Sequence, residues 1–278
     1  MCSRQRWKDE VQLKNFCLGY QEPRHFLQFE WGWPKLYIGW RAFWAAYHLT
    51  WIIVSGFLSW QWTTSKANEI KWFIYLTDWT YFVLTLAALL DFTAVVYTHI
   101  ARADIVQGLT NDITWYEKTV WVLFNIGNCG SVVVSILYWA LLYSASTTTI
   151  TAVDVGTHAL NSVYVFINMV VIATPVRLYH VFHTMIYFLT YVLFSFIYHK
   201  SGGTSGTDKP YIYSILDWDS APGTAVAYSC LMIFLAVPIA HVSLFLLYML
   251  RVAVFNLLLN RDTIRDENAI SMKEIDNA

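Results

Sequence analysis

Residues 115–143 read WYEKTVWVLFNIGNCGSVVVSILYWALLY, and no acidic or basic side chain follows Lys118 in this stretch. About 20 helical residues cross a hydrocarbon core of roughly 30 Å, so the run is long enough to span a membrane. It also lacks the alternating pattern, repeated over about 10 residues, that barrel strands show. The stretch therefore predicts a transmembrane helix.

Five other apolar runs accompany it. They are Tyr37–Trp60, Trp72–His99, Val155–His180, Thr184–His199 and Ala225–Leu259. Because lipid offers the backbone no hydrogen-bond partners, helices are the expected form of all of them. The sequence predicts an all-α, six-span transmembrane helix bundle over residues 36–259. An N-terminal segment, residues 1–35, precedes it, and a tail, residues 260–278, follows it.

The composition supports a membrane protein and excludes other classes. The 278 residues are 57% hydrophobic and 13% charged, against about 25% charged residues in soluble domains. A net charge of −1 provides no basic surface for nucleic acid. Membrane lipids are therefore the expected partners. No motif indicates a cofactor, and none identifies a protein partner.

Basic residues predict the orientation. With six spans, 14 of the 18 Lys and Arg residues fall on the side that holds both termini, and four fall on the other side. Because cytosolic loops carry the excess of basic residues, both termini are predicted to be cytosolic.

Polar side chains inside two spans are the candidate functional residues. Asp78 follows Thr77 in the second span, about seven residues from its outer end. In the fourth span Asp154, His158 and Asn161 recur at helical spacing and share one face. His158 and Asn161 are expected at nearly the depth of Asp78, which predicts an Asp–His pair between the two spans.

Three interpretations of this cluster remain open. Polar side chains can join helices at about 0.6–2 kcal/mol each. They can instead form an active site, in which His158 is the general base, Thr77 the nucleophile and Asp78 the carboxylate that holds the imidazole. An acyl-chain substrate would then be expected. A proton or ion pathway is the third interpretation.

A second cluster consists of Arg177, His180 and His183, which are expected at the inner interface. One spaced His pair is too little for a metal site of the lipid-hydroxylase type, so no metal is predicted. The cluster is expected to contact lipid phosphates or to serve as an interfacial anchor.

Three segments give the chain a family resemblance. They are His158–Tyr164 (HALNSVY), Trp72–Trp79 (WFIYLTDW) and Tyr211–Trp218 (YIYSILDW). They resemble the rolling stone proteins, and the likeness extends over nearly the whole chain except the tails. Rolling stone proteins are multi-pass membrane proteins of fusing muscle cells. The resemblance implies a plasma-membrane protein with a role in myoblast fusion during muscle development.

A more remote similarity links the chain to the androgen-induced family of transmembrane threonine hydrolases, which cleave fatty acid esters of hydroxy fatty acids. When Asp78 is matched to the Asp of that family's early helix, Tyr75 stands in place of its Thr, with Thr77 two residues away. His158 matches the first His of its His-x-x-His motif, and Asn161 replaces the second. The similarity implies a Thr-type lipid-ester hydrolase, with Asn161 as a supporting donor, unless this branch has lost the activity.

Overall fold

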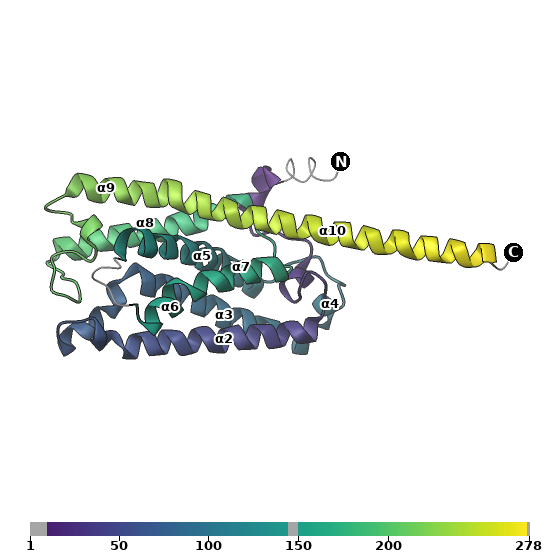
Figure 1. The fold of residues 1–278 in the computed structure, drawn as a ribbon, viewed down its shortest axis with the longest axis horizontal. Coiled ribbons are helices and arrows are strands. Elements are labelled where there is room, and N and C mark those ends of the chain that lie inside the picture. The colour runs from purple at the N-terminus through teal and green to yellow at the C-terminus, as the bar shows by residue number, and fades with distance from the viewer. Residues whose placement is uncertain (1–9, 144–149, 277–278) are drawn as a thin grey trace.

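A computed structural model describes residues 10–143 and 150–276 of the chain, with side chains as far as Leu259. In that part the protein is all-α, and its long helices lie side by side in one elongated bundle (Figure 1). The α-helices are α2 (Pro34–Phe57), α3 (Leu76–Ala101), α4 (Ala103–Val106), α5 (Trp115–Leu137), α6 (Ala152–His158), α7 (Leu160–Val171), α8 (Val181–Lys200), α9 (Pro222–Leu231) and α10 (Val237–Asp276).

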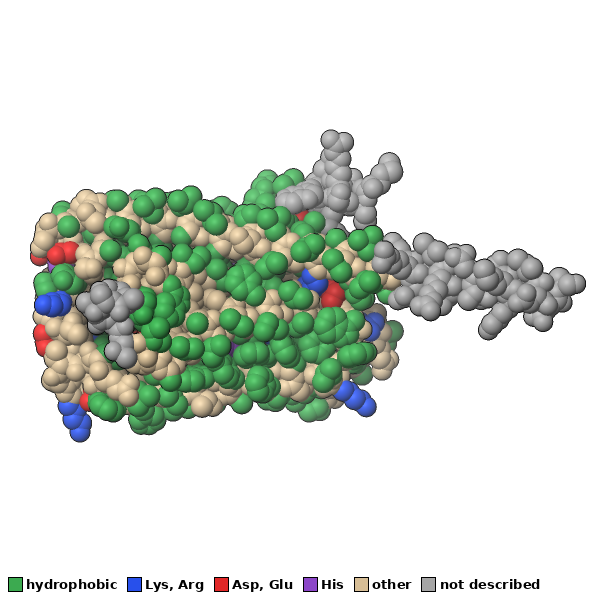
Figure 2. Space-filling model, in the orientation of Figure 1, with side chains coloured by type: hydrophobic (Ala, Val, Ile, Leu, Met, Phe, Trp, Pro, Cys, Tyr) green, Lys and Arg blue, Asp and Glu red, His purple; other side chains and the backbone are tan. Residues whose placement is uncertain are grey.

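Four of the described helical stretches are long and apolar enough to cross a membrane: Leu76–Ala101, Trp115–Leu142, Leu178–Lys200 and Pro222–Leu259. α2 has 24 residues, but Arg41 and His48 make it less apolar than these four. Apolar side chains cover most of the visible face of the bundle, and charged ones gather toward its two ends (Figure 2). The chain is therefore a multi-pass membrane protein.

The centre of the bundle is the contact between α3 and α5. A Cβ atom at Gly127 would stand 3.0 Å from Leu84 Cα, and one at Gly130 would stand 2.9 Å from Thr80 Cγ2. Small residues allow helices this close an approach in membranes. Trp121 of α5 is fully buried beside them and donates its indole N–H to the carbonyl of Pro175 at 2.9 Å.

The second predicted span begins later than expected. Lys66–Ile74 form a 3₁₀ helix, Tyr75 is extended, and α3 starts only at Leu76. Asp78 therefore lies in the first turn of α3 and not deep in the span. The expectation of a helix from Trp72 was wrong because Tyr75 and Leu76 are held by the loop that follows α8. Tyr75 Oη accepts from Gly206 N, and Leu76 N donates to Tyr213 Oη.

The fourth predicted span, Val155–His180, is also corrected. Its helix is divided at Ala159 and ends at Val171, after which the chain is extended as far as Arg177. Pro175 lies in this extended stretch, and the stretch pairs with the N-terminal segment. Glu30 N donates to Val171 O, and Ala173 N donates to Gln28 O. A contact between residues so distant in sequence leaves no periodic signal.

The N-terminal segment packs against the bundle from residue 10 onward. Phe26 and Phe29 are buried in the main hydrophobic core. Glu30 forms an ion pair with Arg251 of α10 at 2.9 Å. Residues 10–33 lie toward the end of the bundle from which α10 projects (Figure 1).

The predicted tail, residues 260–278, begins inside a helix, because α10 continues through Asp276. The described residues do not include 1–9 and 277–278. Three of the basic residues that predict the orientation, Arg4, Arg6 and Lys8, are among those left out.

Candidate functional site

A cavity of about 480 Å³ opens at the end of the bundle that holds the α8–α9 loop. Its wall is formed by the end of α2, the 3₁₀ segments after it, the start of α3, the end of the α5 stretch, α6 and Tyr213 of the loop. Three of the four candidate residues, Thr77, Asp78 and His158, line this one cavity. Helices that are distant in sequence thus bring the predicted residues to a common space.

Thr77 and Asp78 are positioned by the start of α3. The extended Tyr75 precedes the helix, so both residues belong to its first turn. The side chain of Asp78 is 92% buried, since only 8% of the residue is exposed. Among the described residues it has no hydrogen-bond or ion-pair partner. A carboxylate in a first turn is stabilised by the helix dipole, and Asp78 lines the cavity.

His158 is the last residue of α6 and is 6% exposed. Its ring stacks flat on Tyr138, with centroids 3.6 Å apart and planes 3° from parallel. Its backbone carbonyl accepts from Trp139 Nε1 at 3.2 Å. Its Nδ1 has no hydrogen-bond partner among the described residues. The imidazole is therefore held by stacking, and its ring nitrogen Nδ1 is unpaired.

Tyr138 reaches His158 because the end of the α5 stretch is irregular. Residues Tyr138–Leu142 form a π-helix, a turn that recurs at functional sites. Nothing in the sequence signals this turn, and sequence reasoning missed Tyr138 for that reason. It missed Tyr213 as well, because that side chain is brought in by a loop. Burial raises the pKa of Tyr213, so its hydroxyl is neutral at physiological pH.

Asn161 does not line the cavity. Its Nδ2 donates to Thr157 O at 2.6 Å, and its Oδ1 accepts from Ser135 Oγ and from the backbone N–H of Ser162. Both ends of the amide are thus occupied: Oδ1 joins α7 to α5 through Ser135, and Nδ2 joins α7 to α6 through Thr157. The geometry gives Asn161 the interhelical role that was one of the open interpretations.

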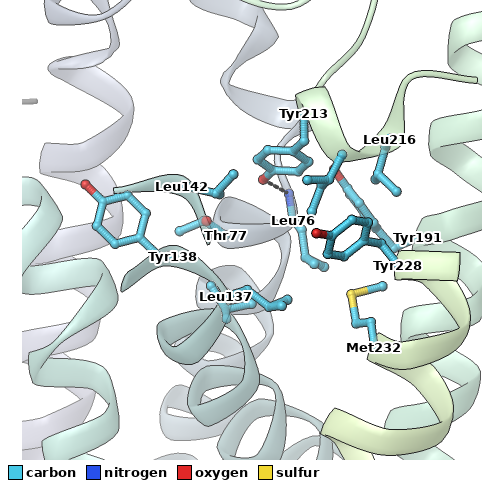
Figure 3. A pocket seen from close by; sticks show the side chains of 12 residues that line it. Leu76, Thr77, Leu137, Tyr138, Leu142, Tyr191, Tyr213, Leu216, Tyr228 and Met232 are labelled. Carbon is cyan, nitrogen blue, oxygen red and sulfur yellow. Dashed lines mark hydrogen bonds between the residues drawn. The ribbon is translucent and has the colours of Figure 1, made fainter. Parts of the chain in front are cut away.

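A smaller apolar pocket adjoins the cavity, with a volume of about 40 Å³. The two spaces share Thr77, Tyr138, Leu142 and Tyr213. Figure 3 shows Thr77 and Leu142 between Tyr138 on one side and Tyr213, Tyr228 and Met232 on the other. The wall of the smaller pocket is almost entirely hydrocarbon and aromatic. Thr77 therefore stands where a polar space meets an apolar one.

The remaining polar residues of the fourth span have separate partners. Asp154 forms a capping box with Thr151 at the start of α6 and also lines the cavity. Asn168 accepts from Trp40 Nε1 and Arg41 Nη1. Arg41 in turn forms a buried ion pair with Asp91 at 2.9 Å. The polar face predicted for this span therefore contributes to two places. Asp154 and His158 line the cavity, and Asn168 bonds to Arg41 of the buried ion pair.

Two residues of the second cluster are engaged by other parts of the protein, and Arg177 and His183 are only partly buried. His180 is fully buried, and its Nδ1 lies 3.2 Å from Asn125 Nδ2. Arg177 donates to Asn15 and to the Gly19 carbonyl, so the N-terminal segment occupies its guanidinium. The expected lipid-phosphate contact is therefore wrong for His180. Among the described residues, no three His, Cys, Asp or Glu side chains are grouped so that they could hold a metal ion.

The fold and the cavity define the class: a multi-pass, all-α membrane protein with a partly polar cavity at one end of its bundle. Within that class the chain belongs to the rolling stone family, since the family description "Protein rolling stone" matches residues 2–262. It is similar to protein rolling stone of Drosophila melanogaster, with 29% identity over 87% of this chain and 88% of the relative. No solved structure matches the chain.

Proposed function

We propose that this protein acts in the plasma membrane in support of myoblast fusion. The observation that carries the proposal is the match to the rolling stone family over residues 2–262. The Drosophila relative is covered over 88% of its length, so the likeness concerns a whole membrane protein and not a shared module.

We further propose six crossings with both termini in the cytosol. In addition to the four long apolar stretches, α2 has 24 residues and would extend about 36 Å at 1.5 Å per residue. Residues 152–171 of α6 and α7 are interrupted only at Ala159. The distribution of Lys and Arg supports a cytosolic location for both ends.

The test of the fusion role is genetic. Muscle precursors that lack this protein are expected to form fewer multinucleate fibres, and the wild-type chain should restore them. Normal fibres in its absence would contradict the role. Expression of other membrane proteins at the cell surface serves as the control for general damage.

A second candidate function is favoured by one observation, the shared cavity of Thr77, Asp78 and His158. It is an intramembrane lipid-ester hydrolase or acyltransferase. His158 would take the proton of the Thr77 hydroxyl while Thr77 Oγ attacks the ester carbonyl. The released alkoxide would recover that proton and leave as an alcohol. Water or a second alcohol would then remove the acyl group from Thr77.

The predicted Asp–His pair is not formed, since no ion pair joins Asp78 and His158 among the described residues. In this proposal Asp78 acts on the protonated imidazole only through the cavity that both residues line. Thr77 and His158 form no hydrogen bond with each other among the described contacts. Catalytic hydrogen bonds are often long before a ligand binds, so this geometry is compatible with the role.

Labelling with a fluorophosphonate probe tests the chemistry. The folded wild-type protein should be labelled, and Thr77→Val and His158→Ala should each reduce labelling by about 100-fold or more. Thr93→Val is the matched control, because Thr93 is on an exposed part of α3 and bonds only to Leu89 O. The absence of labelling on the folded wild type would remove the nucleophile and leave the fusion role unaffected.

A further inference from the structure

The cavity has an unusual balance of charge. Two carboxylates, Asp78 and Asp154, line it, and no Lys or Arg is among its lining residues. Asp78 is 8% exposed and has no hydrogen-bond or ion-pair partner among the described residues. A buried carboxylate without a partner is costly. A ligand of opposite charge in the cavity would remove this cost.

Lys71, a basic side chain at the same end of the bundle, is already engaged. Lys71 Nζ donates to Thr204 Oγ1 and to Ser205 O, and it lies 3.6 Å from Asp208 Oδ1. Lys71 is not among the lining residues. Within residues 10–143 and 150–259, no Lys or Arg forms an ion pair with Asp78.

Aromatic rings form much of the rest of the wall. Trp62, Trp72, Tyr75, Tyr138 and Tyr213 all line the cavity. Trp62 and Tyr75 meet edge to face at 5.0 Å, and Tyr75 and Tyr213 do so at 5.7 Å. Rings gathered around a carboxylate are the arrangement in which proteins bind ammonium groups, through cation–π attraction.

The apolar pocket beside the cavity offers a place for the hydrocarbon part of a ligand whose ammonium group lies in the cavity. It shares Thr77 and Leu142 with the cavity and continues toward Leu216 and Met232 (Figure 3). A headgroup in the aromatic cavity would direct the start of a hydrocarbon chain into this pocket. An anionic lipid would instead bring its charge toward Asp78 and Asp154.

We infer that the cavity binds the ammonium headgroup of a single-chain lipid, with Asp78 as the counter-ion and the chain entering beside Thr77. The inference deepens the second candidate function, which it rests on: a lysophosphatidylcholine bound in this way carries the ester that such an enzyme would cleave, whereas a simple alkylammonium lipid has no ester and is a ligand only. It excludes free fatty acids and other lipids whose headgroup is a carboxylate. A quaternary ammonium could belong to a simple alkylammonium lipid or to a lysophosphatidylcholine.

Photo-crosslinking tests the inference on the full chain, purified in a neutral maltoside detergent. Three probes carry the same 12-carbon, diazirine-bearing chain and differ only in the headgroup: trimethylammonium, phosphocholine or carboxylate. The trimethylammonium probe is expected to label about tenfold more than the carboxylate probe. Phosphocholine labelling at the level of trimethylammonium would assign the site to lysophospholipids, and weak phosphocholine labelling would assign it to simple cationic lipids. Equal labelling by the trimethylammonium and carboxylate probes, or a preference for the carboxylate, would overturn the inference.

Variants of Asp78 test whether this residue is the source of the headgroup preference. Asp78→Asn should remove the preference for the cation, and Asp78→Glu should retain most of it. Asp112→Asn is the control, because Asp112 is an exposed acid outside the cavity. Should Asp78→Asn fail to fold, the headgroup preference of the wild type still decides the question. Binding needs no turnover, so a protein that prefers the cation but is not labelled by the fluorophosphonate would keep this inference and lose the hydrolase.

Discussion

Arg41 and Asp91 form a charge pair in the interior of the bundle. Their side chains are 2% and 10% exposed and lie 2.9 Å apart. Tyr37 Oη and Asn168 Oδ1 accept further hydrogen bonds from the guanidinium. A buried charge is tolerated only when it is paired and hydrogen-bonded. Here both terminal nitrogens of the guanidinium have partners, and Nε has none among the described residues. The pair joins α2 to α3, and Asn168 adds α7 to the same network.

Removal of the guanidinium should therefore be costly. Arg41→Ala leaves Asp91 buried without its cation, and we expect a loss of about 3–5 kcal/mol in the free energy of unfolding. Denaturation of the purified protein in mixed micelles measures this. The double variant Arg41→Ala with Asp91→Asn should lose less than Arg41→Ala alone.

The control for this prediction is the exposed pair of Arg102 and Asp104, whose side chains are 35% and 42% exposed. Arg102→Ala should leave stability nearly unchanged, because solvent screens such pairs. Equal effects of Arg41→Ala and Arg102→Ala would show that the inner pair does not hold the helices together.

At the scale of elements, the close contact between α3 and α5 depends on Gly127, which has no side chain. A Cβ at Gly127 would meet the backbone of Leu84 at 3.0 Å, and a backbone cannot move aside as a flexible side chain can. Gly127→Ala should therefore cost about 1–3 kcal/mol through overpacking. Thermal unfolding in detergent measures the loss.

Gly39 provides the matched control within α2. A Cβ there meets nothing within 4 Å. Gly39→Ala should be neutral or should stabilise the protein by up to about 1 kcal/mol, because Ala favours helix. A Gly127→Ala variant as stable as Gly39→Ala would contradict the close approach of α3 and α5.

The loop after α8 is attached to the 3₁₀ segment Lys66–Ile74 through Asp208. Thr64 Oγ1 and Asn68 Nδ2 donate to its carboxylate, and Thr64 N donates to Gly206 O. The hydrogen bonds from Thr64 and Asn68 hold the pKa of Asp208 below its usual value, and Lys71 adds to the effect. This attachment also positions Gly206 N on Tyr75 Oη at the rim of the cavity.

This linkage predicts a pH dependence. A lowered pKa in the folded state means that the attachment contributes fully above the unfolded pKa of about 3.9 and is lost as the pH falls through the lower folded value. Amide hydrogen exchange in residues 201–209, corrected for the intrinsic effect of pH, should accelerate severalfold at that point. Asp208→Asn should exchange quickly at every pH, and exposed Asp112→Asn should behave as the wild type. Unchanged exchange in Asp208→Asn would show that the loop is held by other contacts.

For the whole molecule, the sequence predicts the helices but not every boundary. Apolar runs locate α3, α5, α8 and the α9–α10 stretch, because exclusion from water and satisfaction of the backbone are properties of the local chain. The extended residues 172–177 could not be predicted, since they depend on contacts with residues 28–30. The break in the helix is a consequence of tertiary pairing.

The candidate site likewise contains residues that the sequence predicts and residues that it does not. The order of the spans suffices to place Thr77, Asp78 and His158 at one end of the bundle, and all three line the same cavity, although Asp78 lies in the first turn of α3 and not at the predicted depth. The spacing does not determine which neighbours the side chain of Asn161 contacts. Its amide bonds to Ser135 and Thr157 and does not line the cavity. Tyr138 and Tyr213 reach the cavity through a π-turn and a loop, which leave no periodic signal.

The proposed topology of the whole molecule makes a final prediction. Gln107 follows α3 and the short helix α4, and Ser201 follows α8; both residues are exposed. With six crossings and cytosolic termini, Ser201 faces the outside and Gln107 the cytosol. In intact cells a membrane-impermeant maleimide should label Ser201→Cys strongly and Gln107→Cys no more than the wild type. After permeabilisation both should react. Labelling of Gln107→Cys in intact cells would contradict the proposed orientation, because α3 would then run in the opposite direction and the cavity of Asp78 would open toward the cytosol.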